Sequence, residues 1–441
     1  MIRSLGLFLA IGLTALAFTT PFQNLSTIPD QLRLFSGEVH RYSWTVPAVT
    51  ASSDSEVVSI QETENQEMAI TSRTDGSAKI QFKLFNRIPV KTTEVQVFAP
   101  LHLIPGGQSI GVELHSAGIM VVGFHQVTEK EKTASPGEQA NIKVGDLILK
   151  VNGERVENTQ RVSELIQKSG QTRLPLELEL ARGKEIYTTR MYPVFDEKSK
   201  AYRVGLYIRD SAAGVGTLTF YDPQHQVYGA LGHVITDMDT QKPITVGEGT
   251  IYPSQVTDIE RGASGEPGQK RAFFRSDHPI GTIEKNTPFG IFGRMEKTPP
   301  NGLISEAMEV GLSEEVRRGP AEMLTVVDGK KVESYDIEIV DIFPQRYPAT
   351  KGMIIKVTDE VLLKKTGGII QGMSGSPIIQ DGKLIGAVTH VFVNDPTSGY
   401  ATFIEWMLKD AEILKDGATA LSSFVVCFLF LFRRKDFPRG R

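Results

Sequence analysis

Residues 203–412 form a succession of short strand-like runs separated by turn signals. Runs such as 215–221 and 384–393 have strand length, and the dipeptides Asp328-Gly329 and Asp381-Gly382 are typical of tight hairpins. Strands joined by short turns run antiparallel, whereas parallel strands need a long crossover that is usually a helix. The spacing therefore predicts an antiparallel β-barrel domain over 203–412, within a mainly β protein.

The length, charge and cysteine content of the chain restrict what else it can be. Its 441 residues are enough for two to three domains of about 150 residues each. The net charge of -4 argues against a nucleic-acid partner, because phosphate backbones are bound by an excess of basic side chains. Cys427 is the only cysteine, which excludes an internal disulfide, a cysteine-ligated metal and a cysteine nucleophile in the globular part. We expect no cofactor and no metal site.

Both ends of the chain are apolar. Residues 1–20 hold Arg3 followed by an apolar run to Phe18, which is typical of an export signal, and the run is almost long enough to persist as a membrane anchor. At the other end, residues 413–441 hold an apolar stretch over 418–432 that precedes three basic residues. A second anchor, a tail altered by a change of reading frame and an unpacked appendage all stay open there. We expect an exported protein that contacts the membrane through its N-terminal segment.

Two further regions lie between the signal segment and the barrel. Residues 24–104 contain short alternating runs separated by polar clusters, which favours a β-rich region. Residues 106–195 combine strand candidates with a helix expected over 159–168, which Asn158 or Thr159 can cap. An Asn152-Gly153 dipeptide marks a hairpin after the strand that precedes it.

The stretch Ser135-Pro-Gly-Glu-Gln-Ala-Asn-Ile-Lys-Val-Gly-Asp-Leu-Ile-Leu-Lys-Val-Asn-Gly-Glu154 resembles the PDZ family, so residues 106–195 are expected to be an α+β PDZ domain. The resemblance implies that a peptide, or a segment of the chain itself, adds as a strand beside the helix. Residues 119–124 are the expected docking strand. The family's usual carboxylate loop has no clear counterpart there, which argues against capture of a free C-terminus. A spacer that binds nothing is the alternative.

The loop Gly372-Met-Ser-Gly-Ser-Pro377 resembles the nucleophile loop of chymotrypsin-like peptidases. Glycines on both sides of a serine let the backbone turn sharply and aim successive amides at one point, where negative charge develops on a carbonyl oxygen. The resemblance makes Ser374 the nucleophile and the amides of Gly372 and Ser374 the oxyanion hole. Ser376 is the competing hydroxyl.

A serine needs a base to take its proton, and histidine is suited because its ordinary pKa is near 6.5. His233 follows an apolar strand and precedes the serine in the chain, as the base does in chymotrypsin-like domains. Thr389 and His390 lie on the strand after the serine loop, where the resemblance predicts a wall of the substrate cleft. His233 is therefore the expected base, with Thr389 and His390 expected to contact peptide substrates.

A closer resemblance covers residues 106–408. The block Leu231-Gly-His-Val-Ile-Thr-Asp237 and the long block from Gly372 to Tyr400 are similar to the stage IV sporulation protein B family of peptidases. The resemblance implies Asp359 as the acid that orients His233; from the residues alone, Asp237, Asp277 and Asp341 stay open. It also implies an exported peptidase of endospore formation that acts in the space between the forespore and mother-cell membranes. Such a peptidase cleaves itself and a regulator of an intramembrane protease, so that a mother-cell sigma factor matures.

Two other classes of function stay in view. One is a membrane-anchored scaffold in which the PDZ domain binds partners and the barrel is catalytically inactive. The other is an anchored chaperone or receptor. The serine, glycine and histidine set argues against both, because neither needs an exposed serine with a base in reach.

Overall fold

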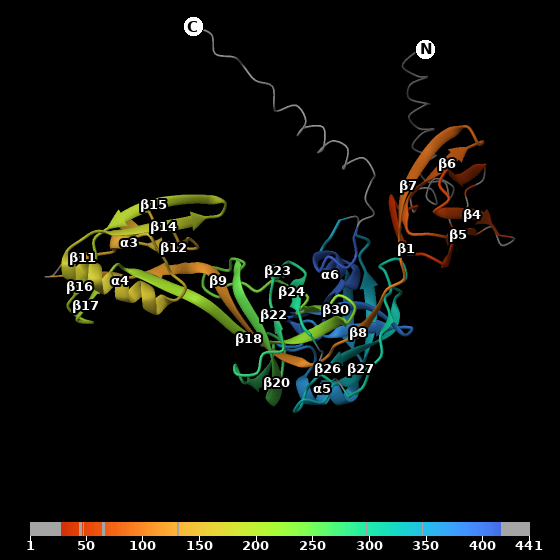
Figure 1. Cartoon of the computed structure of the whole chain (residues 1–441). Coiled ribbons are helices and arrows are strands. Elements are labelled where there is room, and N and C mark those ends of the chain that lie inside the picture. The colour runs from red at the N-terminus through yellow and green to blue at the C-terminus, as the bar shows by residue number, and fades with distance from the viewer. Residues whose placement is uncertain are drawn as a thin grey trace, which may run out of the picture.

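The computed structural model describes residues 28–43, 46, 48–63, 67–129, 132–296, 299–300, 302–345 and 347–415. The expected signal segment at 1–20 and nearly all of the apolar tail lie outside these ranges. Within them, no helix combines the length and the apolar composition that a membrane span needs. The fold is mainly β, as predicted, and has three parts (Figure 1).

The N-terminal part is a small sandwich of two sheets. One sheet has the order β1-β7-β6-β3 and the other the order β2-β5-β4. The strands are β1 (Gln31–Phe35), β2 (Val39–Tyr42), β3 (Val49–Ser53), β4 (Val58–Glu62), β5 (Met68–Ser72), β6 (Gly76–Leu84) and β7 (Ile88–Phe98). Alternating residues such as Ile80 and Phe82 on β6 point inward and are buried with Leu34 and Ile70. This part confirms the expected β-rich region.

The central part contains two units built from antiparallel strands: an open sheet, called the first layer, and a closed barrel, called the second layer. The barrel has six strands in the order β26-β27-β28-β31-β30-β29. Its elements are β26 (Gly319–Thr325), β27 (Glu333–Ile342), β28 (Met353–Val357), α5 (Glu360–Thr366), β29 (Pro377–Gln380), β30 (Lys383–Phe392), β31 (Asp395–Phe403) and α6 (Ile404–Asp410). The barrel closes around apolar side chains such as Met323, Ile355 and Phe403, so no edge is left open.

The first layer is part of a larger sheet. Its strands are β8 (His102–Pro105), β9 (Ser109–Phe124), β18 (Leu206–Asp222), β19 (Val227–Ala230), β20 (Val246–Glu260), β21 (Gln269–Phe274), β22 (Gly281–Thr282), β23 (Lys285–Thr287), β24 (Gly290–Arg294) and β25 (Met308–Glu309). They enclose a second apolar core, which includes Ile110, Leu218 and Tyr228. The cavity described below lies where this layer meets the barrel.

The third part is the region expected to be a PDZ domain, and it lies at the far end of the molecule from the sandwich (Figure 1). Its elements are β10 (Val127–Glu129), β11 (Lys132–Ala134), α3 (Pro136–Gln139), β12 (Leu147–Val151), β13 (Glu154–Arg155), α4 (Thr159–Thr172), β14 (Leu176–Arg182), β15 (Glu185–Met191), β16 (Val194–Asp196) and β17 (Ala201–Arg203). Asn158 caps α4 by accepting from the amide of Arg161 at 2.8 Å, and Asn152 and Gly153 both have positive φ at the hairpin. The predicted helix and hairpin are both present.

A long two-stranded ribbon joins the PDZ domain to the central part. β9 and β18 pair antiparallel from Thr217 opposite Ser109 to Leu206 opposite Phe124, with register shifts between Tyr207 and Ile208 and between Arg209 and Ser211. Residues 110–116 of β9 also pair with β20 in the central part. The PDZ domain is therefore an insertion between two strands of the central part, and the expected boundary at residue 106 is corrected to the middle of β9.

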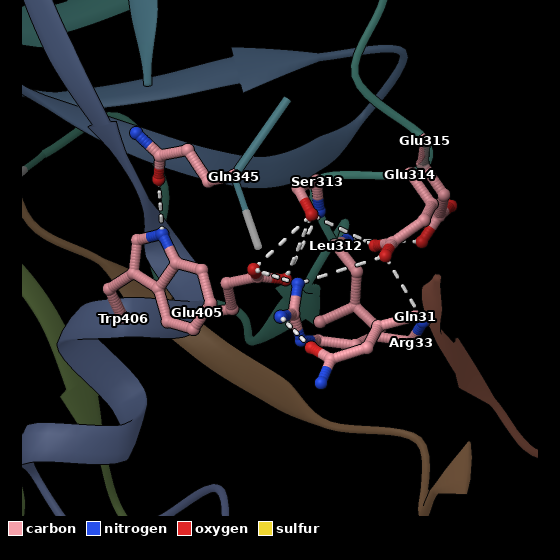
Figure 2. Close-up of polar contacts among 9 residues, drawn as sticks. All are labelled: Gln31, Arg33, Leu312, Ser313, Glu314, Glu315, Gln345, Glu405 and Trp406. Carbon is pink, nitrogen blue, oxygen red and sulfur yellow. Dashed lines mark hydrogen bonds and ion pairs between the residues drawn. The ribbon is translucent and has the colours of Figure 1, made fainter. Parts of the chain in front are cut away.

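The sandwich is joined to the barrel through a buried arginine. Arg33 Nη1 lies 3.1 Å from Oε1 of Glu405 at the start of α6, and its guanidinium lies 4.6 Å from the centre of the Trp406 ring. Glu314 accepts from the Arg33 amide at 3.1 Å, and the Ser313 hydroxyl donates to Glu405 (Figure 2). Each charged group in this cluster therefore has a partner of opposite charge or a hydrogen-bond donor.

Candidate active site

The loop that carries Ser374 connects α5 to β29 and depends on two glycines. Gly372 and Gly375 both have φ of +91°, a conformation that other residues rarely adopt. A Cβ on Gly375 would lie 2.2 Å from the Thr217 carbonyl oxygen and 2.4 Å from the Leu231 nitrogen. Only glycine fits there, so the sequence pattern Gly-Met-Ser-Gly has a direct steric cause.

The amides of this loop fall into two groups. Those of Met373, Gly375 and Ser376 donate to backbone carbonyls at 3.1, 2.8 and 2.9 Å. Among the described residues, the amides of Gly372 and Ser374 have no acceptor in the protein. Two unpaired amides separated by one residue, beside a serine hydroxyl, are what an oxyanion hole requires.

Two threonines of β18 hold the loop from behind. The Thr217 hydroxyl donates to the Gly372 carbonyl at 2.8 Å, and the Thr217 amide donates to the Ser374 carbonyl at 3.1 Å. The Thr219 hydroxyl donates to the Gly375 carbonyl at 2.7 Å. Both threonines are fully buried. Sequence reasoning missed them, although hydroxyl residues two apart on an otherwise apolar strand share one face and could have pointed to a buried polar role.

His233 follows β19 at a turn where Leu231 and Gly232 both have positive φ. Its Nδ1 lies 2.9 Å from the Val234 carbonyl oxygen, which can only accept, so Nδ1 carries the proton and Nε2 is free to accept one. Burial lowers the pKa of His233 below 6.5, and the bond to Val234 opposes that shift in part. The imidazole is therefore neutral near pH 7 and has the tautomer that a general base needs.

Ser374, Gly372, His233 and His390 line one cavity of about 1020 Å³. The structure thus brings the predicted nucleophile and base together. Within the described residues, no hydrogen bond joins the two side chains: the Ser374 hydroxyl donates to the Thr389 carbonyl at 3.1 Å. Catalytic hydrogen bonds are often made only when substrate is bound, and a rotation of the serine side chain would redirect its hydroxyl.

His390 and Thr389, the two residues expected in the wall of the substrate cleft, have different positions relative to the cavity. His390 lies in the cavity, with its ring centre 5.5 Å from that of His233, and burial together with the His233 and Lys351 charges lowers its pKa. The Thr389 side chain is buried and donates to the Tyr400 carbonyl, so this residue reaches the site only through its own carbonyl oxygen. Ser376 is fully buried, which removes it as the reactive hydroxyl.

The structure does not bring Asp359 to His233. The Asp359 carboxylate caps α5 by accepting from the amide of Leu362 at 2.8 Å, and Asp359 does not line the cavity. The position beside Nδ1 that an orienting acid would take holds the Val234 carbonyl instead. The expected contact between Asp359 and His233 is corrected accordingly, because the carboxylate is used by the helix.

The other acidic candidates have partners of their own. Asp237 lines the cavity, but it is paired with Arg209 at 2.7 Å and accepts from the amide of Thr240. Burial alone would raise the pKa of Asp237; the Thr240 bonds and the Arg209 guanidinium lower it overall. Asp277 and Asp341 pair with arginines at the surface.

The open sheet edge beside α4 is not on the strand that was expected to dock a peptide. Residues 119 and 120 of β9 pair with β12 on one side, and residues 120–124 pair with β18 on the other. In the part of the chain that the structure describes, residues 206–209 of β18 pair with β9 alone, and Asp210 accepts from the Thr159 amide at the start of α4. The open edge beside α4 therefore belongs to β18, and the prediction of 119–124 is wrong because residues 119–121 are bonded to 145–148 on one side while residues 120–124 pair with β18 on the other.

Comparison with known protein families identifies two domains of the chain. Residues 200–408 match the model of the SpoIVB peptidase S55 family. The chain carries a SpoIVB peptidase S55 domain. Residues 128–180 match the PDZ domain model, so the resemblance found in the sequence is confirmed for both domains. The S55 domain makes the chain a serine endopeptidase.

Solved structures show more distant likenesses. The active form of the Rv3671c protease from M. tuberculosis is 18% identical, with 47% of this chain and 76% of that chain covered and a TM-score of 0.29. Its inactive form is 16% identical, with 45% and 84% covered and a TM-score of 0.27. The family match, and not these likenesses, identifies the S55 domain.

Proposed function

We propose that this S55 peptidase uses Ser374 as nucleophile and His233 as general base, with the Gly372 and Ser374 amides as oxyanion hole. The observation that carries the proposal is that all three residues line one cavity, with the unpaired amides beside the serine. The Ser374 oxygen attacks the scissile carbonyl and its proton passes to His233 Nε2, while the carbonyl oxygen takes negative charge against the two amides. His233 then gives the proton to the departing amine, and water releases the acyl group by the same route.

We propose further that the enzyme is exported, is held at the membrane by its N-terminal segment and acts in endospore formation. The support is the family match of residues 200–408 together with the resemblance of the blocks around His233 and Ser374. Its substrates are then its own chain and a regulator of an intramembrane protease in the space between forespore and mother cell. Cleavage of that regulator leads to maturation of a mother-cell sigma factor.

The PDZ domain supports a regulatory part of the proposal. Residues 206–209 of β18 form the open edge beside α4, residues 211–215 of the same strand line the catalytic cavity, and Thr217 holds the serine loop. A peptide that adds to this edge therefore acts on a strand that continues into the active site. Deletion of residues 118–205 should alter peptidase rates if this connection is used, and unchanged rates with every substrate tested would remove the regulatory claim.

The structure gives Asp359 the role of helix cap, whereas the resemblance implied the role of orienting acid. Asp359→Asn separates them, because asparagine caps a helix as well as aspartate does but cannot stabilise an imidazolium. An orienting acid predicts a fall in kcat of about 10⁴-fold. A cap predicts near-normal kcat for Asp359→Asn and a loss of about 1 kcal/mol of stability for Asp359→Ala.

The whole proposal is tested by mass spectrometry of products from the full chain. Incubation alone should yield self-cleavage fragments, and incubation with the extracytoplasmic part of an intramembrane-protease regulator from an endospore former should yield fragments of that protein. Ser374→Ala should yield neither. Cleavage of the chain without cleavage of the regulator would keep the peptidase and reject its proposed substrate.

A further inference from the structure

Lys270 is a buried lysine that lies directly beneath the oxyanion loop. It belongs to β21 and is 6% exposed. Its amide donates to the Gln371 carbonyl at 2.9 Å, and the Gln371 amide donates to the Gly268 carbonyl at 2.8 Å. The residue that precedes Gly372 is thus fixed to β21 by two backbone hydrogen bonds.

The side chain of Lys270 continues this support. A Cβ on Gly372 would lie 3.2 to 3.4 Å from the Cβ, Cγ and Cδ atoms of Lys270, so the aliphatic stem covers the inner face of Gly372. The amine at the far end donates to the Thr325 hydroxyl at 2.8 Å. Thr325 is fully buried on β26 of the barrel. Lys270 therefore spans from the first β-layer to the barrel, with Gly372 resting on its stem.

Burial of the Lys270 amine costs free energy, and filling this space does not require a charged side chain. Burial lowers the pKa of Lys270 from 10.5 to about 7, and burial is the whole cause of the shift. In the part of the chain that the structure describes, no carboxylate pairs with the amine; the group that faces it is the Thr325 hydroxyl. A methionine would fill a similar volume without a charge to desolvate. A costly group at this position points to a role in the reaction.

We propose that Lys270 is a positioning residue of the peptidase reaction. Its stem, held at one end by β21 and at the other by Thr325, fixes the Gln371–Gly372 peptide so that the Gly372 amide faces the cavity. The inference rests on the proposed function, in which that amide binds the oxyanion. Its effect should appear in the transition state, where the carbonyl oxygen carries charge, and not in the binding of substrate.

The test compares Lys270→Met and Thr325→Val in the full chain, alone and combined. Lys270→Met keeps most of the stem and removes its anchor, whereas Thr325→Val keeps the lysine and removes its partner. Each should lower kcat about 10-fold, less than the roughly 100-fold to 1,000-fold of losing an oxyanion donor. KM should change less than twofold, and the double variant should fall no further than either single variant, because both remove the same link.

The matched control is Arg271→Met on the next residue of β21, which is exposed and pairs with Glu260 at the surface. It should leave kcat unchanged. Loss of stability without a fall in kcat for Lys270→Met and Thr325→Val, or additive losses in the double variant, would overturn the inference. Ser374→Ala separates this failure from that of the proposed function: an inactive Ser374→Ala beside a fully active Lys270→Met rejects the role of Lys270 alone.

Discussion

Arg33 and Lys270 are both buried basic side chains, but their surroundings differ. Arg33 joins the sandwich to the barrel and has the Glu405 carboxylate, the Glu314 carboxylate and the Trp406 ring around it. Lys270 lies beneath the oxyanion loop and has a single hydroxyl. The charge that joins the sandwich to the barrel is compensated by carboxylates, whereas among the described residues the amine of the side chain that supports Gly372 has only a hydroxyl as partner. The difference suggests that the first serves stability and the second serves catalysis.

The largest expected effect is at Arg33. Arg33→Ala leaves the buried Glu405 carboxylate and the partly buried Glu314 carboxylate without their cation, and loss of one partner of a buried ion pair typically costs about 3–5 kcal/mol. We expect a clear fall in the melting temperature, measured by calorimetry on the full chain. Arg41→Ala, an exposed arginine of the same sandwich, is the control. Equal melting temperatures for the two variants would mean that the Arg33 cluster does not stabilise the interface.

Lys270→Met should raise the free energy of unfolding, whereas Arg33→Ala should lower it. Replacement of buried ionic groups by apolar side chains of similar volume is often neutral or stabilises a protein by about 1–4 kcal/mol, and Lys270 has no counter-ion among the described residues to lose. The folded pKa of about 7 lies below the usual 10.5, so between these values the unfolded chain binds a proton that the folded chain does not. The stability of the native protein therefore rises with pH across this window.

The gain from Lys270→Met should consequently be greatest below pH 7 and disappear above about pH 10.5. Denaturant unfolding at several pH values measures it. A variant that is less stable than the native protein at pH 7 would remove the contrast with Arg33.

The smallest effect concerns which carboxylate compensates Arg33. Glu405 lies 3.1 Å from the guanidinium and is fully buried, whereas Glu314 lies 3.8 Å away. Glu405→Gln should therefore cost about 1–3 kcal/mol. Glu314→Gln should cost less than about 1 kcal/mol, because the Glu314 carboxylate is farther from the guanidinium and its side chain is 14% exposed. Thermal unfolding of both variants measures these costs. Equal losses of stability would show that Glu405 and Glu314 compensate the Arg33 charge equally.

The local part of this architecture could be predicted from the sequence. The Ser374 loop, the α4 cap at Asn158 and the Asn152-Gly153 hairpin each depend on residues that are close together in the chain. The free edge of β18 and the support of Gly372 by Lys270 depend on pairings between distant segments. The residue pattern of one strand does not show which other strand pairs with each of its edges.

Asp359 is a residue whose local sequence fits two different roles. An aspartate followed by a short apolar-basic segment fits both a helix cap and a catalytic acid, and the sequence alone does not separate them. What separates them is the position of α5 relative to His233, which is set by the packing of the whole barrel.

Covalent labelling of the full chain with a fluorophosphonate, followed by peptide mapping, tests whether Ser374 is the nucleophile and His233 its base. We expect one modified residue, Ser374, with labelling abolished in Ser374→Ala and strongly slowed in His233→Ala, because the hydroxyl then lacks its base. Labelling at any other serine, or undiminished labelling of Ser374→Ala, would contradict this expectation.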